Sequence, residues 1–206
     1  MDIPVQNIPH ADAFRAWLQI EKGLSDNTIN AYIQDLYKLA QFSDEHAGKL
    51  HPESTDITTL REFLHWIHDI GLSPTSQARI LSGIKAYFKF LKMEEITENN
   101  PAELLETPRT KRKLPVVLSL EEIDAIVGII DMSKPQSQRN RAIIETLYGC
   151  GLRVSELTEL KLSNLHFSEG FIRVIGKGNS ERLVPIGETA MKEINNYVKY
   201  ERVHVE

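Results

Sequence analysis

The chain has 206 residues, 41% of them hydrophobic and 26% charged, which is typical of a folded protein with one large domain or two small ones. No apolar run approaches the roughly eighteen residues that cross a bilayer, and the N-terminal segment lacks a signal-peptide pattern, so we expect a cytoplasmic protein without a membrane partner. The single cysteine, Cys150, excludes an intramolecular disulfide and makes a cysteine-based zinc site a poor candidate. The formal net charge of −5 disfavours nucleic acid as a partner, but the distribution of the charges matters more than their sum.

Two segments concentrate cations without any acidic residue. Residues 76–92 contain Arg79, Lys85, Lys89 and Lys92, and residues 108–113 contain four further cations in the sequence PRTKRK. Segregation of this kind is compatible with a DNA-binding surface and equally with an ordinary solvated helix face. Charge alone therefore leaves both interpretations open.

The first half of the chain is predicted to be helical. Apolar residues recur every three to four positions in four segments, 11–20, 28–42, 57–70 and 78–91. Capping residues precede the last three of these segments: Ser25 and Asp26, Thr55 and Asp56, and Ser73 followed by Pro74. Gly23 and Gly71 stand where helices should stop, and the residues after Pro101 predict a short fifth helix.

A domain boundary is predicted within residues 108–115, where two prolines and four cations leave almost nothing to bury. This segment is interpreted as an exposed basic linker between a first domain over residues 1–107 and a second over residues 116–206. The second domain is predicted to open with two helices. One begins with a capping-box pattern within residues 119–130, and the other, within 138–151, should end at one of its last glycines.

A small sheet is predicted after these helices. Residues 165–186 alternate apolar and polar positions, with turn sequences at 168–170 and 176–180. This pattern indicates three antiparallel strands. A final helix is expected over residues 188–203, so that the fold is mainly α with one small sheet.

Two cations of the second domain occupy positions suited to binding a phosphate. Arg153 is expected in the first turn of a helix, near free backbone N–H groups and the positive end of the helix dipole. The alternative is a surface ion pair with Glu156, one turn away. Lys177 lies between two glycines at the tip of a hairpin, where it could reach a DNA groove or serve only solubility.

These cations belong to two longer motifs. A helix ending in Tyr-Gly-x-Gly is followed by a helix opening with Leu-Arg-x-x-Glu-Leu, in Tyr148, Gly149, Gly151, Leu152, Arg153, Glu156 and Leu157. A Gly-Lys-Gly turn, Gly176 to Gly178, is followed on the next strand by Arg182 and Pro185. In this order and spacing the motifs resemble the start of the catalytic domain of the tyrosine recombinase, or phage integrase, family, most closely its Xer-type members. The helical first half and the basic linker extend the resemblance over essentially the whole chain.

The resemblance implies an N-terminal SAM-like core-binding domain of four to five helices, followed by a mixed α/β catalytic domain. It implies a site-specific recombinase that cuts and rejoins DNA strands through a 3′-phosphotyrosyl intermediate, with no metal or nucleotide cofactor. Arg153 would stabilise charge on the scissile phosphate, Lys177 would protonate the leaving 5′ oxygen, and Glu156 would support the site. The partners would be a duplex recombination site and further protomers in a tetrameric synapse.

The resemblance also implies DNA contacts outside the catalytic residues. The fourth helix would approach the major groove, and the linker would follow the phosphates. The residues expected to make these contacts are Arg79, Ser82 and Lys85 on the helix and Arg109, Lys111 and Arg112 in the linker.

Several parts of the family's catalytic apparatus have no match in the sequence. Members carry a later His-x-x-Arg pair, a further His or Trp, and a nucleophilic tyrosine near the C-terminus. The 206 residues contain no His-x-x-Arg, and Tyr197 and Tyr200 follow the sheet too closely to match the nucleophile. We therefore expect a catalytic domain that is cut short, and a chain that binds DNA without cleaving it.

Two other functions remain open at this point. The chain could be a catalytically dead DNA-binding protein that occupies a recombinase's site, or its helical half could be a protein-interaction module. The motifs distinguish neither chromosome-dimer resolution from mobile-element integration nor one DNA target sequence from another.

The remaining conspicuous residues are expected to have structural roles. The aromatic residues on helical faces are assigned to core packing: Trp17, Tyr32, Phe63, Trp66 and Phe88. Cys150 is expected to be a small packing residue. His65 and His68 lie one turn apart without a third ligand nearby in the sequence, so no metal site is expected.

Overall fold

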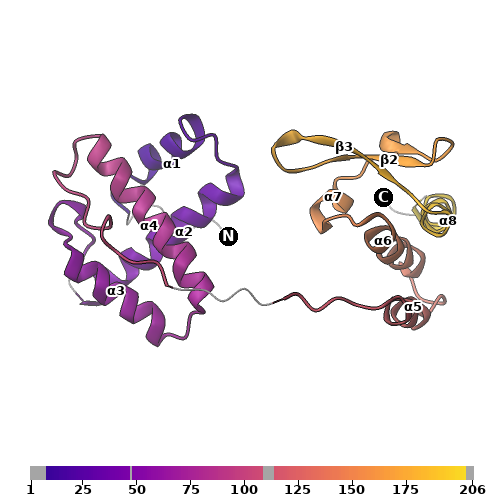
Figure 1. The fold of residues 1–206 in the computed structure, drawn as a ribbon, viewed down its shortest axis with the longest axis horizontal. Coiled ribbons are helices and arrows are strands. Elements are labelled where there is room, and N and C mark those ends of the chain that lie inside the picture. Colours follow the sequence, from indigo (N-terminus) through magenta and orange to yellow (C-terminus); the bar gives the residue numbers. More distant parts are fainter. Residues whose placement is uncertain (1–7, 47, 109–113, 203–206) are drawn as a thin grey trace. The chain divides into compact units, whose positions relative to one another are not determined.

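The computed structural model describes residues 8–46, 48–108 and 114–202 (Figure 1). The chain divides into two compact units, Met1–Lys113 and Leu114–Glu206. None of the helices in the described part of the chain has the length and apolar character needed to cross a membrane.

The first unit contains the four predicted helices, which are confirmed. Their bounds are α1 Ala11–Ile20, α2 Asp26–His46, α3 Ile57–Asp69 and α4 Pro74–Met93, with a short 3₁₀ helix, η2, at Pro52–Ser54. Helix α4 packs against the other three helices, and α2 also contacts α1 and α3. Figure 1 shows α4, in magenta, crossing the bundle beside α2.

Local capping explains where these helices begin and end. The Asp56 carboxylate accepts a hydrogen bond of 2.8 Å from the backbone N–H of Thr59, which satisfies a free donor at the start of α3. Ser73 caps α4 in the same way, with proline at the first helical position. Gly71 has φ +84°, the left-handed conformation in which a side chain is unfavourable, and it ends the turn after α3.

Aromatic side chains dominate the core of the first unit. Of the aromatic residues predicted to pack in the core, Phe63, Phe88 and Trp17 are buried, and Tyr32 and Trp66 are partly buried against the same core. Tyr87 was not singled out from the sequence, but it is also fully buried, and its hydroxyl donates a hydrogen bond of 2.8 Å to the carbonyl of Pro9. This bond ties α4 to the segment that precedes α1.

The prediction of a short fifth helix after Pro101 is wrong. Residues 101–104 form turns and residues 105–108 have no regular structure. The hydrogen bonds here run from Glu103 to Asn100 and from Leu105 to Ala102, three residues back, so no α-helical turn is completed. Pro108 follows closely, and a proline disfavours helical backbone in the residue before it.

The second unit combines helices with a three-stranded sheet, as predicted. The helices are α5 Leu120–Gly128, α6 Ser137–Cys150, α7 Val154–Thr158 and α8 Glu188–Asn196, continued by one π turn, η5, at Tyr197–Glu201. The strands are β1 Leu165–His166, β2 Phe171–Ile175 and β3 Glu181–Pro185, with 3₁₀ turns η3 at Leu162–Asn164 and η4 at Lys177–Asn179. The capping box of Ser119 and Glu122 is present at the start of α5.

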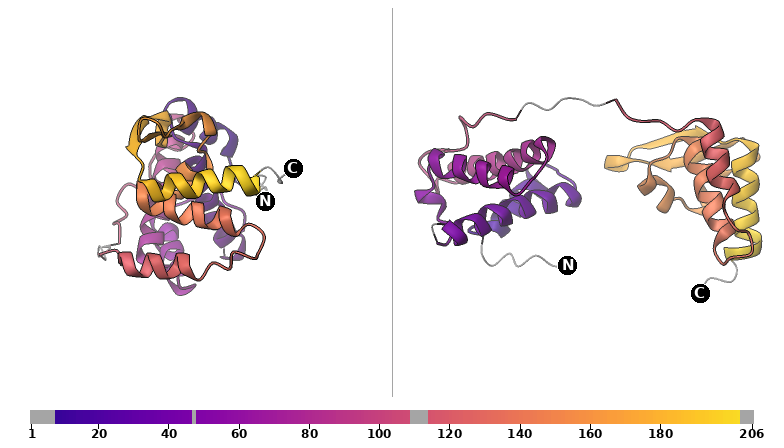
Figure 2. Two further views of the ribbon diagram at one scale, coloured as in Figure 1. Left: turned by 90° about the vertical axis from the view of Figure 1, so that its right-hand side faces the viewer. Right: turned by 90° about the horizontal axis from the view of Figure 1, so that it is seen from below.

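The sheet covers helices α6 and α8. Its order is β1-β2-β3, all antiparallel, with Ile172 opposite Val184 and Val174 opposite Arg182. The buried residues of β2 and β3 form one core with Ala142 of α6 and with the buried residues of α8. Figure 2 shows α6 and α8 side by side, in agreement with their mutual packing.

Candidate functional site

The turn between α6 and α7 places Arg153 at the surface of the second unit. Helix α6 ends at Cys150, and Gly151 then adopts a left-handed conformation with φ +59°. Leu152 is buried, which anchors the turn, and Arg153 follows as the N-cap of α7. Cys150 is itself buried, as expected for a packing residue.

The predicted setting of Arg153 needs a correction. It was expected inside the first turn of a helix, but it is the residue before the helix, in extended backbone with φ −75° and ψ 153°. Helix α7 has only five residues, too few for the aligned peptide dipoles that the sequence argument invoked. Any anion bound here would be held by side chains rather than by a helix dipole.

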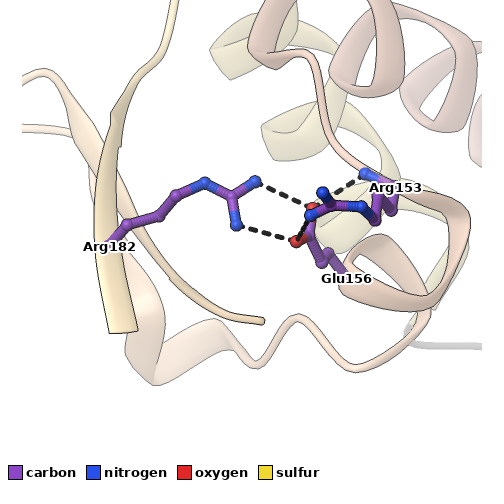
Figure 3. A network of polar contacts seen from close by, with 3 residues as sticks. All are labelled: Arg153, Glu156 and Arg182. Atoms are coloured by element: carbon purple, nitrogen blue, oxygen red, sulfur yellow. Dashed lines mark hydrogen bonds and ion pairs between the residues drawn. The ribbon is translucent and has the colours of Figure 1, made fainter. Parts of the chain in front are cut away.

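The carboxylate of Glu156 organises the site. It accepts hydrogen bonds from the Arg153 backbone N–H at 2.8 Å and from Arg153 Nη1 at 2.9 Å. Arg182, from β3, donates from both terminal nitrogens, Nη1 to Oε1 at 2.7 Å and Nη2 to Oε2 at 2.8 Å (Figure 3). One carboxylate therefore joins two arginines from separate elements of the second unit.

Hydrogen bonds from the two arginines keep Glu156 ionised. The Glu156 side chain is 3% exposed, whereas those of Arg153 and Arg182 are 75% and 40% exposed. The paired hydrogen bonds from Arg182, together with the Arg153 backbone N–H, hold the pKa of Glu156 well below its usual range. Glu156 in turn raises the pKa of Arg182. With one negative and two positive charges, the cluster keeps a net charge of +1 at neutral pH.

The guanidinium of Arg153 has unused binding capacity. A guanidinium carries five N–H donors in a planar fork. Among the residues that the structure describes, only Nη1 of Arg153 donates to a protein acceptor. The ion pair with Glu156 that the sequence offers as the alternative is therefore present, and the other donors of the guanidinium belong to a side chain that is mostly exposed.

The second motif lies next to the first. Gly176 starts the β2–β3 turn, and its backbone N–H donates to the carbonyl of Ser180 at 2.7 Å. A Cβ atom on Gly176 would lie 3.5 Å from Glu156 Oε1 and 3.5 Å from Arg182 Nη1. Gly176, the first residue of the Gly-Lys-Gly turn, therefore lies close to the ion pair of Glu156 and Arg182. Lys177 follows directly, but its side chain lies outside the described part of the structure.

Sequence reasoning named Arg182 without giving it a role. Its contact with Glu156 spans 26 residues and depends on how the sheet packs on α7. One signal was available: Arg182 is two positions from Val184, so both side chains share the face of β3 that turns toward the core.

The predicted DNA-binding residues of α4 lie along one side of the helix, three positions apart. Arg79 donates from Nη1 to Oδ2 of Asp35 at 2.7 Å, and the Ser82 hydroxyl donates to the Ala78 carbonyl. Lys85 borders a surface groove of about 590 Å³ with Lys89 and Lys92, whose other walls are Met93, Asn100 and Glu103. The remaining candidates, Arg109, Lys111 and Arg112, lie outside the described residues.

The structure offers few ligands for a metal ion. No group of three or more His, Cys, Asp or Glu side chains within residues 8–46, 48–108 and 114–202 is arranged to hold one. His65 and His68 are both exposed.

Both units match known protein families. Residues 117–205 match the phage integrase family, and residues 11–95 match the SAM-like N-terminal domain of phage integrases. With both matches in chain order, the chain belongs to the phage integrase family of tyrosine recombinases.

Within that family the chain is similar to proteins named tyrosine recombinase XerD. The relative from Oceanobacillus iheyensis is 40% identical over 189 residues, which cover 92% of this chain and 63% of the relative. The relative from Staphylococcus aureus strain N315 is 38% identical over 188 residues, with coverages of 91% and 63%. The chain thus spans a little less than two thirds of the length of these relatives.

Solved structures support the fold. A lambda integrase (75-356) dimer bound to a COC' core site matches with a TM-score of 0.71 at 18% identity, covering 92% of this chain and 68% of that one. XerH site-specific recombinase bound to a palindromic difH substrate matches with a TM-score of 0.66 at 21% identity, with coverages of 91% and 57%.

Proposed function

We propose that the protein works as a site-specific tyrosine recombinase, with the first unit as a DNA-binding domain and the second as the N-terminal part of a catalytic domain. The observation that carries the proposal is the meeting of the two motifs at Glu156. The Arg153 turn and β3, the strand that leaves the Gly-Lys-Gly hairpin, are distant in sequence, yet Arg153 and Arg182 both donate hydrogen bonds to this carboxylate. The names of the XerD relatives support the same activity.

In this proposal Arg153 binds the non-bridging oxygens of the scissile phosphate. Charge accumulates on these oxygens when a tyrosine hydroxyl attacks phosphorus, and a preorganised guanidinium stabilises it. The attack forms the 3′-phosphotyrosyl bond as the tyrosine hydroxyl releases its proton, and it breaks the bond to the 5′ oxygen, which leaves as a hydroxyl after Lys177 has given it a proton. Attack by a 5′ hydroxyl of the partner strand reverses these steps and restores the phosphodiester without a cofactor.

Glu156 and Arg182 act as positioning residues in this scheme. Glu156 holds both the backbone and the guanidinium of Arg153, and Arg182 holds Glu156 from the strand that leaves the Lys177 hairpin. The ion pair between α7 and β3 therefore links the two proposed catalytic groups. A bidentate carboxylate–guanidinium pair is well suited to this task because its planar geometry restricts rotation.

DNA binding is proposed for both units. Arg79, Ser82 and Lys85 would approach a major groove, while Arg109, Lys111 and Arg112 of the basic linker would contact DNA phosphates. One solved relative, lambda integrase, is described as a tetramer bound to a Holliday junction. We propose a tetrameric synapse of the same kind for the protein at the length of its relatives, acting in the cytoplasm in chromosome-dimer resolution or DNA integration.

The 206 residues by themselves are proposed to bind DNA without cleaving it. They contain no His-x-x-Arg and no tyrosine that matches the family nucleophile. Removing a nucleophile from an enzyme with a covalent mechanism lowers the rate by up to about a millionfold.

A pair of charge-matched variants tests the proposal. Arg153→Gln and Lys192→Gln each remove one positive charge from the second unit, but Lys192 is an exposed residue of α8 that belongs to neither motif. A charge-assisted hydrogen bond to phosphate is worth about 2 kcal/mol, so we expect Arg153→Gln to weaken binding to labelled duplex DNA by about thirtyfold. Lys192→Gln should change it by less than about twofold. Equal effects of the two variants would contradict a phosphate site at Arg153, and a chain that binds no duplex at low salt would favour a protein-interaction module.

A further inference from the structure

A buried carboxylate of the first unit supports one of the proposed DNA-binding residues. The side chain of Asp35, on α2, is fully buried, and its Oδ2 accepts the 2.7 Å hydrogen bond from Arg79 Nη1. The Arg79 side chain is 46% exposed. The pair therefore connects the core of the unit to the outer face of α4.

This arrangement is costly for the fold. Burial raises the pKa of Asp35 to about 6, although the charge of Arg79 and, less strongly, that of Lys38 oppose the rise. Its Oδ1 atom is buried without a hydrogen-bond partner among the described residues. Buried ion pairs are often no better for stability than apolar residues of similar size. Stability is therefore a poor explanation for a carboxylate at this position.

A glycine on the facing helix makes room for the carboxylate. A Cβ atom on Gly83 of α4 would lie 3.0 Å from Oδ2 of Asp35, 3.3 Å from its Cβ and 3.4 Å from Cδ1 of Tyr32. A Cβ contact of 3.0 Å is tighter than nearly all that real side chains make, so a side chain at this position would require the carboxylate to shift by a few tenths of an ångström. The backbone of Gly83 is not left-handed, so its conformation does not require glycine. The contribution of this glycine that the structure shows is the space it leaves for the side chain of Asp35.

We propose that Asp35 is a positioning residue for DNA recognition, which holds one terminal nitrogen of Arg79 so that the remaining N–H donors of the guanidinium face a planar acceptor on duplex DNA. The acceptor is either the O6/N7 edge of a guanine or a pair of phosphate oxygens, which present the same chemistry to a guanidinium. The inference rests on the proposed function, because it takes Arg79 to be a DNA contact. A guanidinium fixed in advance loses less conformational freedom on binding, which raises affinity.

The variant Asp35→Asn separates positioning from simple charge, because the two effects change the DNA affinity in opposite directions. Asp35→Asn removes a negative charge near the proposed DNA face, and Coulomb attraction alone would then make DNA binding tighter. Loss of positioning makes it weaker. Asp44→Asn is the matched control, because Asp44 is an exposed residue of the same helix and its replacement changes the net charge equally.

Gly83→Ala provides a second, charge-neutral perturbation. The added methyl group would press on Oδ2 of Asp35. Alanine favours a helix by about 1 kcal/mol over glycine, which opposes the strain and keeps the variant folded. Gly83→Ala therefore keeps the proposal testable if Asp35→Asn fails to fold.

The experiment uses the whole chain and fluorescein-labelled 30-base-pair duplexes selected by it from a random-sequence library. Binding is measured by fluorescence anisotropy. We expect Asp35→Asn to bind about fivefold more weakly and Gly83→Ala about threefold more weakly, an effect comparable to losing part of one charge-assisted hydrogen bond. Asp44→Asn should bind as well as the unchanged chain or slightly better. In an Arg79→Ala background, Asp35→Asn should not weaken binding further.

A pH series separates positioning from a merely structural role. As the pH falls from 7.5 to 5, Asp35 gains a proton and releases Arg79, so the advantage of the unchanged chain over Asp35→Asn should disappear. The two acceptors are distinguished by repeating the selection with Arg79→Ala. Loss of one guanine from the selected sequence identifies a base edge, whereas uniform weakening with a salt slope reduced by about 1 identifies phosphate.

The outcomes also separate this inference from the proposed function. If Arg79→Ala weakens binding while Asp35→Asn binds as tightly as Asp44→Asn, Arg79 contacts DNA and the role given to Asp35 is wrong. If Arg79→Ala has no effect on a chain that binds DNA, the positioning role fails with the contact it serves. If the unchanged chain selects no duplex at low salt, the proposed function itself fails, and the inference with it.

Discussion

The ionisation of Asp35 should make the first unit less stable as the pH rises. The perturbation is a change of pH from 4.5 to 7.5, applied to the unchanged chain and to Asp35→Asn, in which this group no longer titrates. Burial raises the pKa of Asp35 from 3.8 to about 6, so the folded unit binds the proton more tightly than the unfolded chain does. The resulting stability is fully present below pH 3.8 and is lost as the pH rises through about 6.

The magnitude follows from the size of the shift. A shift of about 2 pKa units corresponds to about 3 kcal/mol, of which about 2 kcal/mol should be lost between pH 4.5 and pH 7.5. Other groups titrate in the opposite sense, because hydrogen bonds from Thr59 lower the pKa of Asp56 and those from Ser133 lower that of Asp131. These groups are present in both proteins, so they cancel in the difference between the two.

The assay is urea unfolding followed by tryptophan fluorescence at several pH values. Both tryptophans of the chain, Trp17 and Trp66, belong to the first unit, so the signal reports that unit alone. The free energy of unfolding of the unchanged chain, minus that of Asp35→Asn, should fall by about 2 kcal/mol across the range. A difference that stays flat, or that rises with pH, would refute the assignment of a buried, proton-binding carboxylate.

Three further predictions concern DNA binding, the Arg153 turn and cleavage. If six cations contact phosphates, the logarithm of the DNA affinity should fall with the logarithm of salt concentration with a slope of about −5, measured by anisotropy titrations, and a flat response would count against the DNA-binding surface. Gly151→Ala should lower the stability of the second unit by about 1–2 kcal/mol, because alanine is strained at φ +59°. Hydrogen exchange of the β2 amides measures this loss, with Gly128→Ala, at the end of α5 with open space and ordinary φ, as a control that should show no loss. Incubation with nicked duplexes drawn from the selected sequences should leave no covalent protein–DNA adduct on a denaturing gel, and an adduct would show that the 206 residues contain a working nucleophile.

The helices were predictable from the sequence because their signals are local. Asp56 caps α3 and Ser73 caps α4 through bonds to residues three positions away, and the apolar spacing needs only the helix period. The contact of Arg153 with Glu156 is also local, because the two residues are one turn apart, and the sequence predicts it. The helix-dipole prediction for Arg153 is wrong because α7 ends after five residues. No single residue of the motif indicates that the helix is so short.

The tertiary pairs could not be derived in the same way. Arg182 meets Glu156 only because the sheet folds back against α7, and Asp35 meets Arg79 across 44 residues. Asp35 also violates the rule that charged residues of an amphipathic helix face water, and its place depends on a glycine of another helix. Residues that break a local pattern in this way are often found where function, rather than stability, determines the choice.

The convergence of Arg153 and Lys177 on one DNA phosphate is the claim on which the proposed function rests. It is tested most directly by nuclear magnetic resonance of the whole chain, labelled with ¹⁵N in arginine and lysine side chains and titrated with a duplex that it has selected. The Arg153 Nε and Lys177 Nζ signals, assigned with Arg153→Lys and Lys177→Arg variants, should shift together and saturate at the same duplex concentration. If one of the two signals keeps its free position when the duplex is saturating, the two side chains do not share a phosphate.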